Sequence, residues 1–328
     1  MHRFKKLLVA SALLTGATVT CAAGYSGVYV FGDSLSDTGN DALLVGADPL
    51  QSVTGNAYIP GKPYASGQFT NGDVWVKPFT SALGLAASGA PSLAGGGNFA
   101  FGGARTATDG AGLVPSLSSQ TSQFLGLVSG HAPTQALYVV EGGGNDARDL
   151  LTAAATSANP AAVIAAGAAA YAQSTGLIVD RLQAAGAQHI VVWDVPNIAG
   201  APAVSSQGAG ASFLGGQVAA AMNGALSARL SVETGVSIFD VHGLQNTIAA
   251  NPSVYGLSNV TDACGAVAGC NAASYLYWDG IHPTTALHSV LAQGMLDTIT
   301  PSVPEPATWA LLAGGLMAIA WASRRREG

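Results

Sequence analysis

The stretch Val28-Tyr29-Val30-Phe31-Gly32-Asp33-Ser34-Leu35 decides the fold class. Its four leading apolar residues are typical of a short buried strand, and Gly32 stands where a parallel strand would end. Ser34 follows just past that end, and open α/β sheets bind their ligands at the carboxyl ends of the strands. Ser34 is therefore a candidate functional residue, although a lone Gly-Asp-Ser turn could equally be a helix cap.

Three further apolar runs of the same kind follow, at residues 137–140, 189–193 and 236–239. Helix-like segments lie between them or after them, at residues 161–185, 213–233 and 285–299. Strands that alternate with helices predict an α/β fold, in which a central parallel sheet is covered by helices on both faces. Residues 41–96 carry few apolar runs and many Gly, Pro, Asn and Ser residues. We interpret this excursion as shaping the entrance of the site.

A second cluster of reactive side chains lies near the other end, in Tyr277-Trp278-Asp279-Gly280-Ile281-His282-Pro283-Thr284. A serine hydroxyl becomes a good nucleophile when a neutral imidazole takes its proton, and a carboxylate on the other ring nitrogen fixes the tautomer. The three-residue spacing lets one loop supply both Asp279 and His282. Alternatively, Asp279 only forms a turn and His282 only lies at the surface. The competing histidines are His131, His189, His288 and His242, the last with Asp240 two residues before it.

Two glycine-rich segments could stabilise the negative charge that forms when a serine attacks a carbonyl carbon. Residues 97–104 are strand-like and contain Gly102-Gly103, where the missing side chains let backbone N–H groups approach a substrate closely. Residues 141–146 follow the second predicted strand and place the Asn145 amide at the same sheet edge. Together with the Ser34 N–H, these donors would form an oxyanion hole. The glycines of the second segment could otherwise form a phosphate loop, but no Lys-Ser/Thr follows them.

These segments, in this order, resemble the sequence blocks of the GDSL (SGNH) hydrolase family, at residues 32–35, 98–103, 143–146 and 279–282. The resemblance implies a flavodoxin-like three-layer α/β/α sandwich, which we place at residues 24–302. It also implies that Ser34 is the nucleophile, His282 the base and Asp279 its partner. The oxyanion hole would consist of the Ser34 N–H, the Gly103 N–H and the Asn145 amide, with Gly102 as the adjacent alternative. No metal or organic cofactor is implied.

Charge is scarce and unevenly placed in this chain. Of the 328 residues only 9% are charged, against about 25% in a usual globular domain. Six of the twelve Lys and Arg residues lie at the two ends, so the body keeps six basic and sixteen acidic residues, a net charge of −10. This acidic balance disfavours nucleic acid as a partner. The hydrophobic share of 49% disfavours disorder.

Residues 1–23 are typical of a secretory signal peptide, with a basic start, an apolar run at 7–14 and small residues up to Ala23. Signal peptidase is then a processing partner. The alternative is an N-terminal membrane helix, but the apolar run is short and is followed by Thr and Gly residues.

The cysteines agree with export. Cys21 would leave with the signal peptide, so Cys264 and Cys270 remain as an even pair. In an oxidising compartment this pair predicts a local disulfide. The alternative is a two-cysteine metal site, which we disfavour because no His or Cys partner follows closely.

Residues 303–328 form a tail in three parts, namely Pro304-Glu305-Pro306, an apolar run at 307–322 and Arg324-Arg325-Arg326. This tail resembles the PEP-CTERM sorting signal of Gram-negative bacteria, in which a membrane exosortase is thought to cut near the Pro-Glu-Pro motif. The alternative is a plain tail anchor, but the apolar run falls just short of the ~17–25 residues that span a bilayer. The resemblance implies transient contact with the inner membrane, followed by a cell-surface or extracellular location.

The sequence therefore predicts an exported serine esterase or lipase that cleaves carboxylic esters through an acyl-enzyme. The 98–105 block and the cysteine-containing loop before Asp279 look most similar to the secreted bacterial esterase and lipase branch of the family. One alternative is an O-deacetylase that trims acetyl groups from surface polysaccharide with the same side chains. The other is a non-catalytic surface protein on the same fold.

Overall fold

The computed structural model describes residues 24–110, 114–300 and 315–316 of the chain. The predicted signal peptide at 1–23 and nearly all of the predicted sorting segment at 303–328 lie outside the described residues. The strands are β1 (Val28–Phe31), β2 (Leu137–Val140), β3 (His189–Trp193), β4 (Val236–Phe239), β5 (Asn259–Ala263) and β6 (Tyr275–Tyr277). The helices are α1 (Asn40–Val45), α2 (Val76–Ala82), α3 (Leu117–Leu127), α4 (Gly144–Ala155), α5 (Pro160–Ala184), α6 (Pro202–Ser205), α7 (Ala209–Leu230), α8 (Val241–Ala250) and α9 (Thr285–Ile299).

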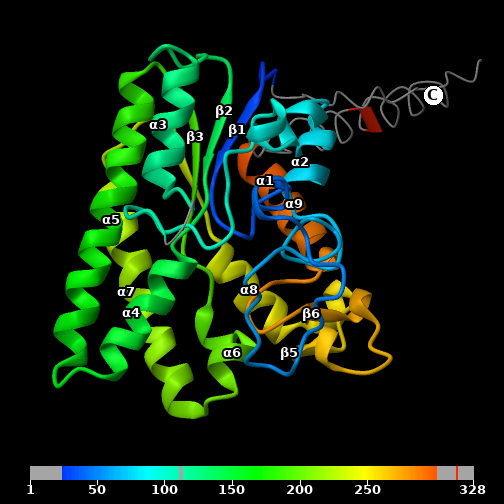
Figure 1. The fold of residues 1–328 in the computed structure, drawn as a ribbon. Helices are drawn as coiled ribbons and strands as arrows, with labels where there is room; N and C mark the ends of the chain where they lie inside the picture. The colour runs from blue at the N-terminus through cyan, green and yellow to red at the C-terminus, as the bar shows by residue number, and fades with distance from the viewer. Residues whose placement is uncertain (1–23, 111–113, 301–314, 317–328) are drawn as a thin grey trace, which may run out of the picture.

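Four short parallel strands form the main sheet, in the order β1-β2-β3-β4. Their bounds coincide with the predicted apolar runs. In register, Phe31 pairs with Val140, and Val140 pairs with Val192. Because all four strands run the same way, their carboxyl ends meet at one edge of the sheet. Figure 1 shows β5, β6, α6 and the loops of the excursion gathered beyond that edge, at the bottom of the view.

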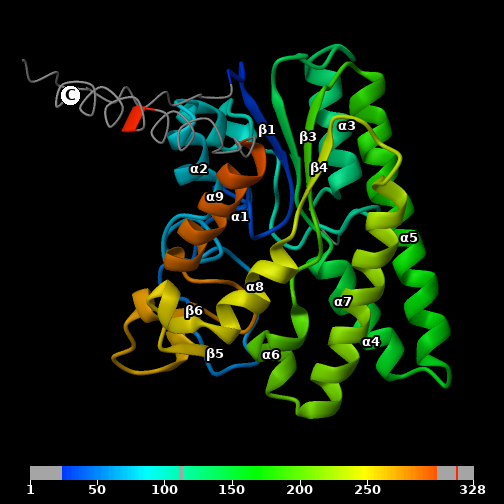
Figure 2. The same cartoon turned by 180° about the vertical axis from the view of Figure 1, so that it is seen from behind.

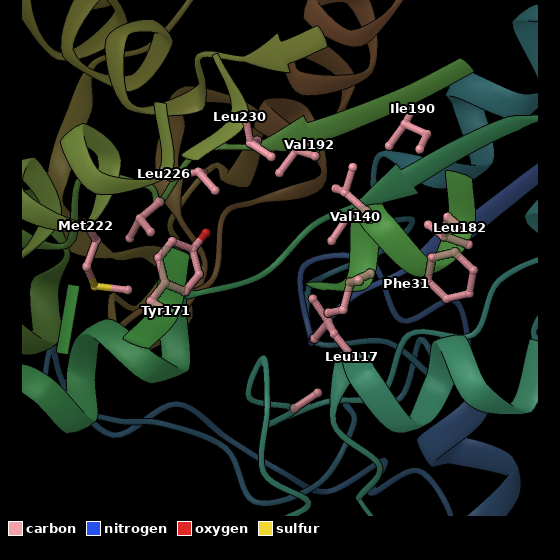
Figure 3. Close-up of a cluster of buried hydrophobic side chains, with 14 of the residues drawn as sticks. Phe31, Leu117, Val140, Tyr171, Leu182, Ile190, Val192, Met222, Leu226 and Leu230 are labelled. Carbon is pink, nitrogen blue, oxygen red and sulfur yellow. The ribbon is translucent and has the colours of Figure 1, made fainter. Parts of the chain in front are cut away.

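One face of the sheet packs on α3, α5 and α7. Phe31, Val140 and Val192 point into this layer, and Figure 3 shows them beside side chains from the covering helices. The buried partners include Leu117 and Phe124 of α3, Ile178 and Leu182 of α5, and Met222 and Leu226 of α7. Burial of each such side chain stabilises the fold by about 1.5–3 kcal/mol.

The alternate residues of the same strands point into a second layer, formed by α2, α8 and α9. Val30, Val139 and Trp193 lie in this layer, and the rings of Trp193 and Trp75 are 4.8 Å apart. Figures 1 and 2 show the sheet between the two groups of helices. Side chains that alternate between two covered faces produce the α/β/α sandwich, and this confirms the predicted fold class.

The three predicted helices are present, with small changes at their ends. Helix α5 begins at Pro160, directly after Asn159, whose side chain caps it by accepting from the Ala162 N–H. Helix α7 starts four residues before its predicted start, after Gly208. Among the described residues, α5 is the one helix long and apolar enough to cross a membrane. It packs against α4 and α7, as a helix of a globular core does.

The strand-like segment at residues 97–104 is not a regular strand. It lies along the free edge of β1, where the Val30 N–H donates to the Gly97 carbonyl and the Phe99 N–H donates to the Val30 carbonyl, at 3.0 and 2.8 Å. The Phe101 N–H then donates to the Gly32 carbonyl at 3.1 Å. These bonds bring Gly102 and Gly103 to the carboxyl end of β1.

Residues 259–277 form a small second sheet of β5 and β6. The predicted disulfide between Cys264 and Cys270 is present in the loop after β5, and its Cα atoms are 5.6 Å apart. The loop that carries Asp279 and His282 runs from β6 to α9. The small sheet therefore holds the start of that loop in place.

Candidate active site

Ser34 lies in a tight turn that follows β1 directly. The Asp33 carbonyl accepts from the N–H groups of Ser36 and Asp37, at 3.1 and 3.0 Å, and the Asp33 carboxylate accepts from the Leu35 N–H at 2.9 Å. Ser34 does not stand at a helix start, because α1 begins only at Asn40. Gly39 lies between the turn and the helix and has a positive φ of 137°. The turn alone therefore presents the Ser34 hydroxyl and N–H.

The loop before α9 brings an imidazole to this hydroxyl. His282 Nε2 is 2.8 Å from Ser34 Oγ, and His282 Nδ1 is 2.7 Å from Asp279 Oδ2. Asp279 Oδ1 accepts from the N–H groups of Ile281 and His282, at 2.9 and 2.8 Å. Ser34, His282 and Asp279 are only 5%, 3% and 0% exposed. The structure thus joins side chains from opposite ends of the domain in one buried hydrogen-bonded line.

Tyr64, from the excursion, completes this line and was not predicted from the sequence. Its hydroxyl donates to Asp279 Oδ2 at 2.8 Å, and its ring packs edge-on against Trp278. Burial, together with the charge of Asp279, raises the pKa of Tyr64 far above its usual value, so this phenol stays a donor. Phe69, from the same excursion, lies against the His282 ring with the ring centres 5.5 Å apart. No pattern in the sequence marks either residue.

The predicted oxyanion donors lie around the same turn. Asn145 Nδ2 donates to the Ala104 carbonyl at 3.0 Å and makes a longer contact of 3.3 Å with Asp33 Oδ2. The Gly102 N–H donates to the Asp37 carboxylate at 3.3 Å, so it is already engaged. Within the described residues, the N–H groups of Gly103 and Ser34 make no hydrogen bond. The geometry thus favours Gly103 over Gly102 as the free donor.

The competing histidines make other contacts. His242 lies in α8, its backbone N–H donates to Asp194 at 3.0 Å, and Asp240 caps that helix through the Gly243 N–H. His131 is exposed and contacts its own loop at the Ser129 carbonyl. His288 is buried in α9, where its Nδ1 accepts from the Trp75 N–H at 3.3 Å. The turn at Ser34 is therefore paired with His282 and with none of these.

Further carboxyl groups are buried beneath the turn. Glu141 Oε2 accepts from the Ser36 hydroxyl at 2.7 Å and from the Asp33 N–H at 3.2 Å. Burial raises the pKa of Asp37 to about 6 and that of Asp41 to about 7. Burial, with the nearby charge of Asp33, raises the pKa of Glu141 well above its usual value. Burial thus favours the neutral form of Glu141.

A small cavity of about 50 Å³ opens beside the turn. Its polar lining includes Ser34, Asn145, Arg148 and His282, together with Asp33, Asn197 and Gln245. Its apolar wall comes from the segment after β3 and from α6, with Tyr277 and Ile281 opposite, and includes Pro196, Ile198, Ala201 and Val204. Within the described parts of the chain, no group of three His, Cys, Asp or Glu side chains is placed to hold a metal ion.

Two parts of the chain match known protein families. Residues 28–295 match the GDSL-like lipase/acylhydrolase family, and residues 302–326 match the PEP-CTERM protein-sorting motif. Both predicted resemblances are thereby confirmed.

Two curated relatives are longer than this chain. It is 28% identical over 319 residues to an uncharacterized protein in the trpE-trpG intergenic region of Pseudomonas putida, with 87% of this chain and 50% of the relative covered. It is 26% identical over 297 residues to the thermolabile hemolysin of Vibrio parahaemolyticus, with 83% and 63% covered. The chain thus spans between one half and two thirds of the length of these relatives.

Among solved structures, phospholipase A1 from Streptomyces albidoflavus is similar with a TM-score of 0.41 and 18% identity, covering 84% of this chain and 99% of that one. The family match extends from the first strand of the sheet almost to the end of α9. The chain belongs to the GDSL-like lipase/acylhydrolase family.

Proposed function

We propose that the protein is an exported serine esterase that cleaves carboxylic esters through an acyl-enzyme. The observation that carries this proposal is the contact of 2.8 Å between Ser34 Oγ and His282 Nε2, with Asp279 on the other ring nitrogen. Membership in an acylhydrolase family supports ester hydrolysis as the reaction class. The sorting motif at 302–326 indicates export and sorting to the surface of a Gram-negative cell.

In this mechanism Ser34 Oγ attacks the ester carbonyl carbon while His282 Nε2 takes its proton. The carbonyl oxygen becomes an oxyanion and accepts from the Ser34 N–H, the Gly103 N–H and the Asn145 amide. When the tetrahedral intermediate collapses, the C–O bond to the alcohol breaks and His282 returns its proton to the leaving oxygen. Water then attacks the acyl group on Ser34, with His282 again as base, and releases the carboxylic acid. Asp279 stabilises the imidazolium in both half-reactions.

The test is the Ser34→Ala variant, assayed with p-nitrophenyl acetate and with a fluorescent organophosphonate that labels activated serines. We expect loss of both hydrolysis and labelling, with unchanged thermal unfolding. The matched control is Ser122→Ala, because Ser122 lies on the exposed side of α3. Retention of most activity in the Ser34→Ala variant would rule out Ser34 as the nucleophile. A wild-type protein that the phosphonate does not label would favour a non-catalytic surface protein.

The size of the cavity favours a small acyl group. The cavity beside Ser34 has a volume of about 50 Å³, and its apolar wall includes Ile198 and Val204. A short acyl group such as acetyl can pack on this wall inside the cavity, whereas a fatty acyl chain would extend beyond it. This observation supports polysaccharide O-deacetylation as the second candidate function.

A series of p-nitrophenyl esters from acetate to dodecanoate separates these possibilities. We expect kcat/KM to be highest for the shortest chains. A maximum at long chains would instead favour a lipase, in line with the hemolysin and phospholipase names of two similar proteins. Release of acetate from an acetylated polysaccharide, faster than from a simple alkyl acetate, would favour the deacetylase.

A further inference from the structure

Arg148 lies one helical turn after Asn145 on α4 and lines the same cavity as Ser34 and His282. Its Nη1 donates to Asn145 Oδ1 at 3.1 Å. Residues three apart lie on one face of a helix, so α4 presents both side chains to the cavity together. Arg148 is half-buried, as are Arg105, Arg181 and Arg229.

The guanidinium fixes which way the Asn145 amide points. A guanidinium has N–H donors and no acceptor, so the amide group that faces it must be the carbonyl oxygen. The NH₂ group then faces the Ala104 carbonyl and the Asp33 carboxylate, both of which accept. A flipped amide would place NH₂ against the guanidinium and its oxygen against two other oxygens. All three contacts therefore favour one orientation, the one an oxyanion donor requires.

One of the two N–H bonds of this amide is available for a reacting oxygen. The bond to the Ala104 carbonyl is 3.0 Å long and holds the amide in place. The contact with Asp33 is 3.3 Å, beyond the usual 2.7–3.2 Å of a strong N–H···O bond, so little is lost when that N–H turns to an oxyanion. Asn145 can thus stay anchored by its oxygen and one hydrogen while the second hydrogen serves the reaction.

Arg148 differs from three of the other cations of the domain in its lack of an ion-pair partner. Lys77, Arg105 and Arg229 each form an ion pair with a carboxylate, at 2.7, 2.8 and 2.6 Å. Within the described residues Arg148 has no carboxylate at ion-pair distance, although it is the one Lys or Arg that lines the cavity. Its positive charge is therefore not neutralised by a direct partner and acts through Asn145, on the side where negative charge would develop.

We propose that Arg148 is a positioning residue that locks the Asn145 amide with its N–H toward Ser34 and polarises that N–H for the transition state. This inference rests on the proposed function. Polarisation of the Asn145 N–H matters most when the carbonyl oxygen carries its full negative charge, so loss of Arg148 should lower kcat. Binding of the neutral ester in its ground state depends little on it.

The experiment is a double-mutant cycle with Arg148→Met, Asn145→Ala and the combined variant, assayed for kcat and KM with p-nitrophenyl acetate. Loss of an oxyanion donor costs about 10²–10³ in kcat, so we expect a loss of about 10–100-fold in Arg148→Met, with KM within about twofold. Because Arg148 acts through Asn145, the combined variant should be no slower than Asn145→Ala by more than about twofold. Arg148→Lys, which keeps a charged donor, should recover part of the rate. Arg181→Met is the matched control, since the Arg181 guanidinium donates hydrogen bonds to Ser118 and Ser122 of α3 and does not line the cavity.

Three outcomes would overturn the proposal. The first is unchanged kcat in Arg148→Met. The second is a fall in kcat on removal of Arg148 that is equally large with Asn145 and with Ala at that position. The third is a rise in KM that is confined to anionic esters, with kcat unchanged, which would show that Arg148 binds substrate charge. If Arg148→Met does not fold, as judged by thermal unfolding, Arg148→Gln and Arg148→Lys take its place in the same cycle. Failure of the proposed function gives a different result, because the wild-type protein would then hydrolyse no ester.

Discussion

Replacement of Asp279 by Asn tests the geometry of the hydrogen-bonded line directly, because the structure determines how the new amide must lie. Oδ1 of Asp279 accepts from the N–H groups of Ile281 and His282. An amide oxygen can keep both bonds and an NH₂ group can keep neither. In Asp279→Asn the oxygen therefore takes the Oδ1 position, and Nδ2 takes the Oδ2 position opposite His282 Nδ1, 2.7 Å away in the wild type.

The consequence is a change of tautomer at His282. The new NH₂ group donates to Nδ1, so the ring proton moves to Nε2, the nitrogen that faces Ser34 Oγ at 2.8 Å. An Nε2 that already carries a proton cannot take the one from Ser34. Where a serine hydrolase has been given this wrong tautomer, kcat falls by about 10⁴, and we expect the same here. Such a loss corresponds to about 5 kcal/mol of transition-state stabilisation.

Tyr64→Phe provides the matched comparison, because it removes a hydrogen bond from the same carboxylate without changing the tautomer. The two backbone N–H groups and His282 still hold Asp279 in place. We expect kcat to fall by less than about tenfold, because the loss of this bond should cost less than the full free energy of a hydrogen bond to a charged group. Stopped-flow assays of p-nitrophenyl acetate give the acylation rate for both variants, and thermal unfolding checks that both are folded. Asp279→Asn with more than about a hundredth of the wild-type rate, or Tyr64→Phe as slow as Asp279→Asn, would refute the tautomer argument.

Two further predictions concern stability. Burial lowers the pKa of His288 to about 3, whereas the unfolded chain takes up this proton near its ordinary pKa of about 6.5, so acid favours unfolding through this residue between those values. In urea unfolding, the free energy of unfolding of His288→Gln relative to wild type should therefore rise by about 2 kcal/mol as the pH falls from about 7.5 to about 5. For the exposed residue, His131→Gln, we expect a difference from wild type that stays constant with pH. A constant difference for His288→Gln would contradict the prediction. A Cβ added at Gly102 would collide with the Phe69 ring and the Asp41 carboxylate, so Gly102→Ala should lower both kcat and the free energy of unfolding, the latter by about 1–3 kcal/mol. Gly126→Ala, in open space on α3, should do neither, and equal effects in the two variants would show that the loop at Gly102 tolerates a side chain.

The four strands were predictable because each is a short run of β-branched and aromatic residues that ends at a glycine or a polar residue. The same local logic placed Ser34 and Asn145 at the ends of β1 and β2. Parallel strands share one carboxyl edge, so the meeting of these side chains followed from the fold class. The short spacing between Asp279 and His282 allowed their pairing to be predicted from one loop.

Tyr64 and Phe69 were not predictable, because their roles depend on how the excursion folds back over the domain. Tyr64 meets Asp279 across 215 residues of sequence, and no periodicity reports such a contact. The irregular course of residues 97–104 was missed for a related reason, since backbone bonds to β1 replace the pairing of a regular strand. Arg148 stands three residues after Asn145 at the start of α4, a helix that we did not predict. Once such a helix is recognised, an i, i+3 pair of this kind is a usable signal.

The arrangement of charge around Ser34 explains why a protein with so few charged residues buries several of them here. An oxyanion that forms beside ionised carboxylates would be repelled, and five carboxyl groups lie buried near the turn, namely Asp33, Asp37, Asp41, Glu141 and Asp279. Burial raises the pKa of Glu141, which disfavours negative charge on this carboxyl group, and its bond with the Ser36 hydroxyl holds the turn. In the proposed mechanism Asp279 stabilises the imidazolium, and it lies on the far side of the ring from Ser34. Arg148 then provides positive charge on the side of the oxyanion, which is why we expect its loss to reduce the rate more than its half-exposed position suggests.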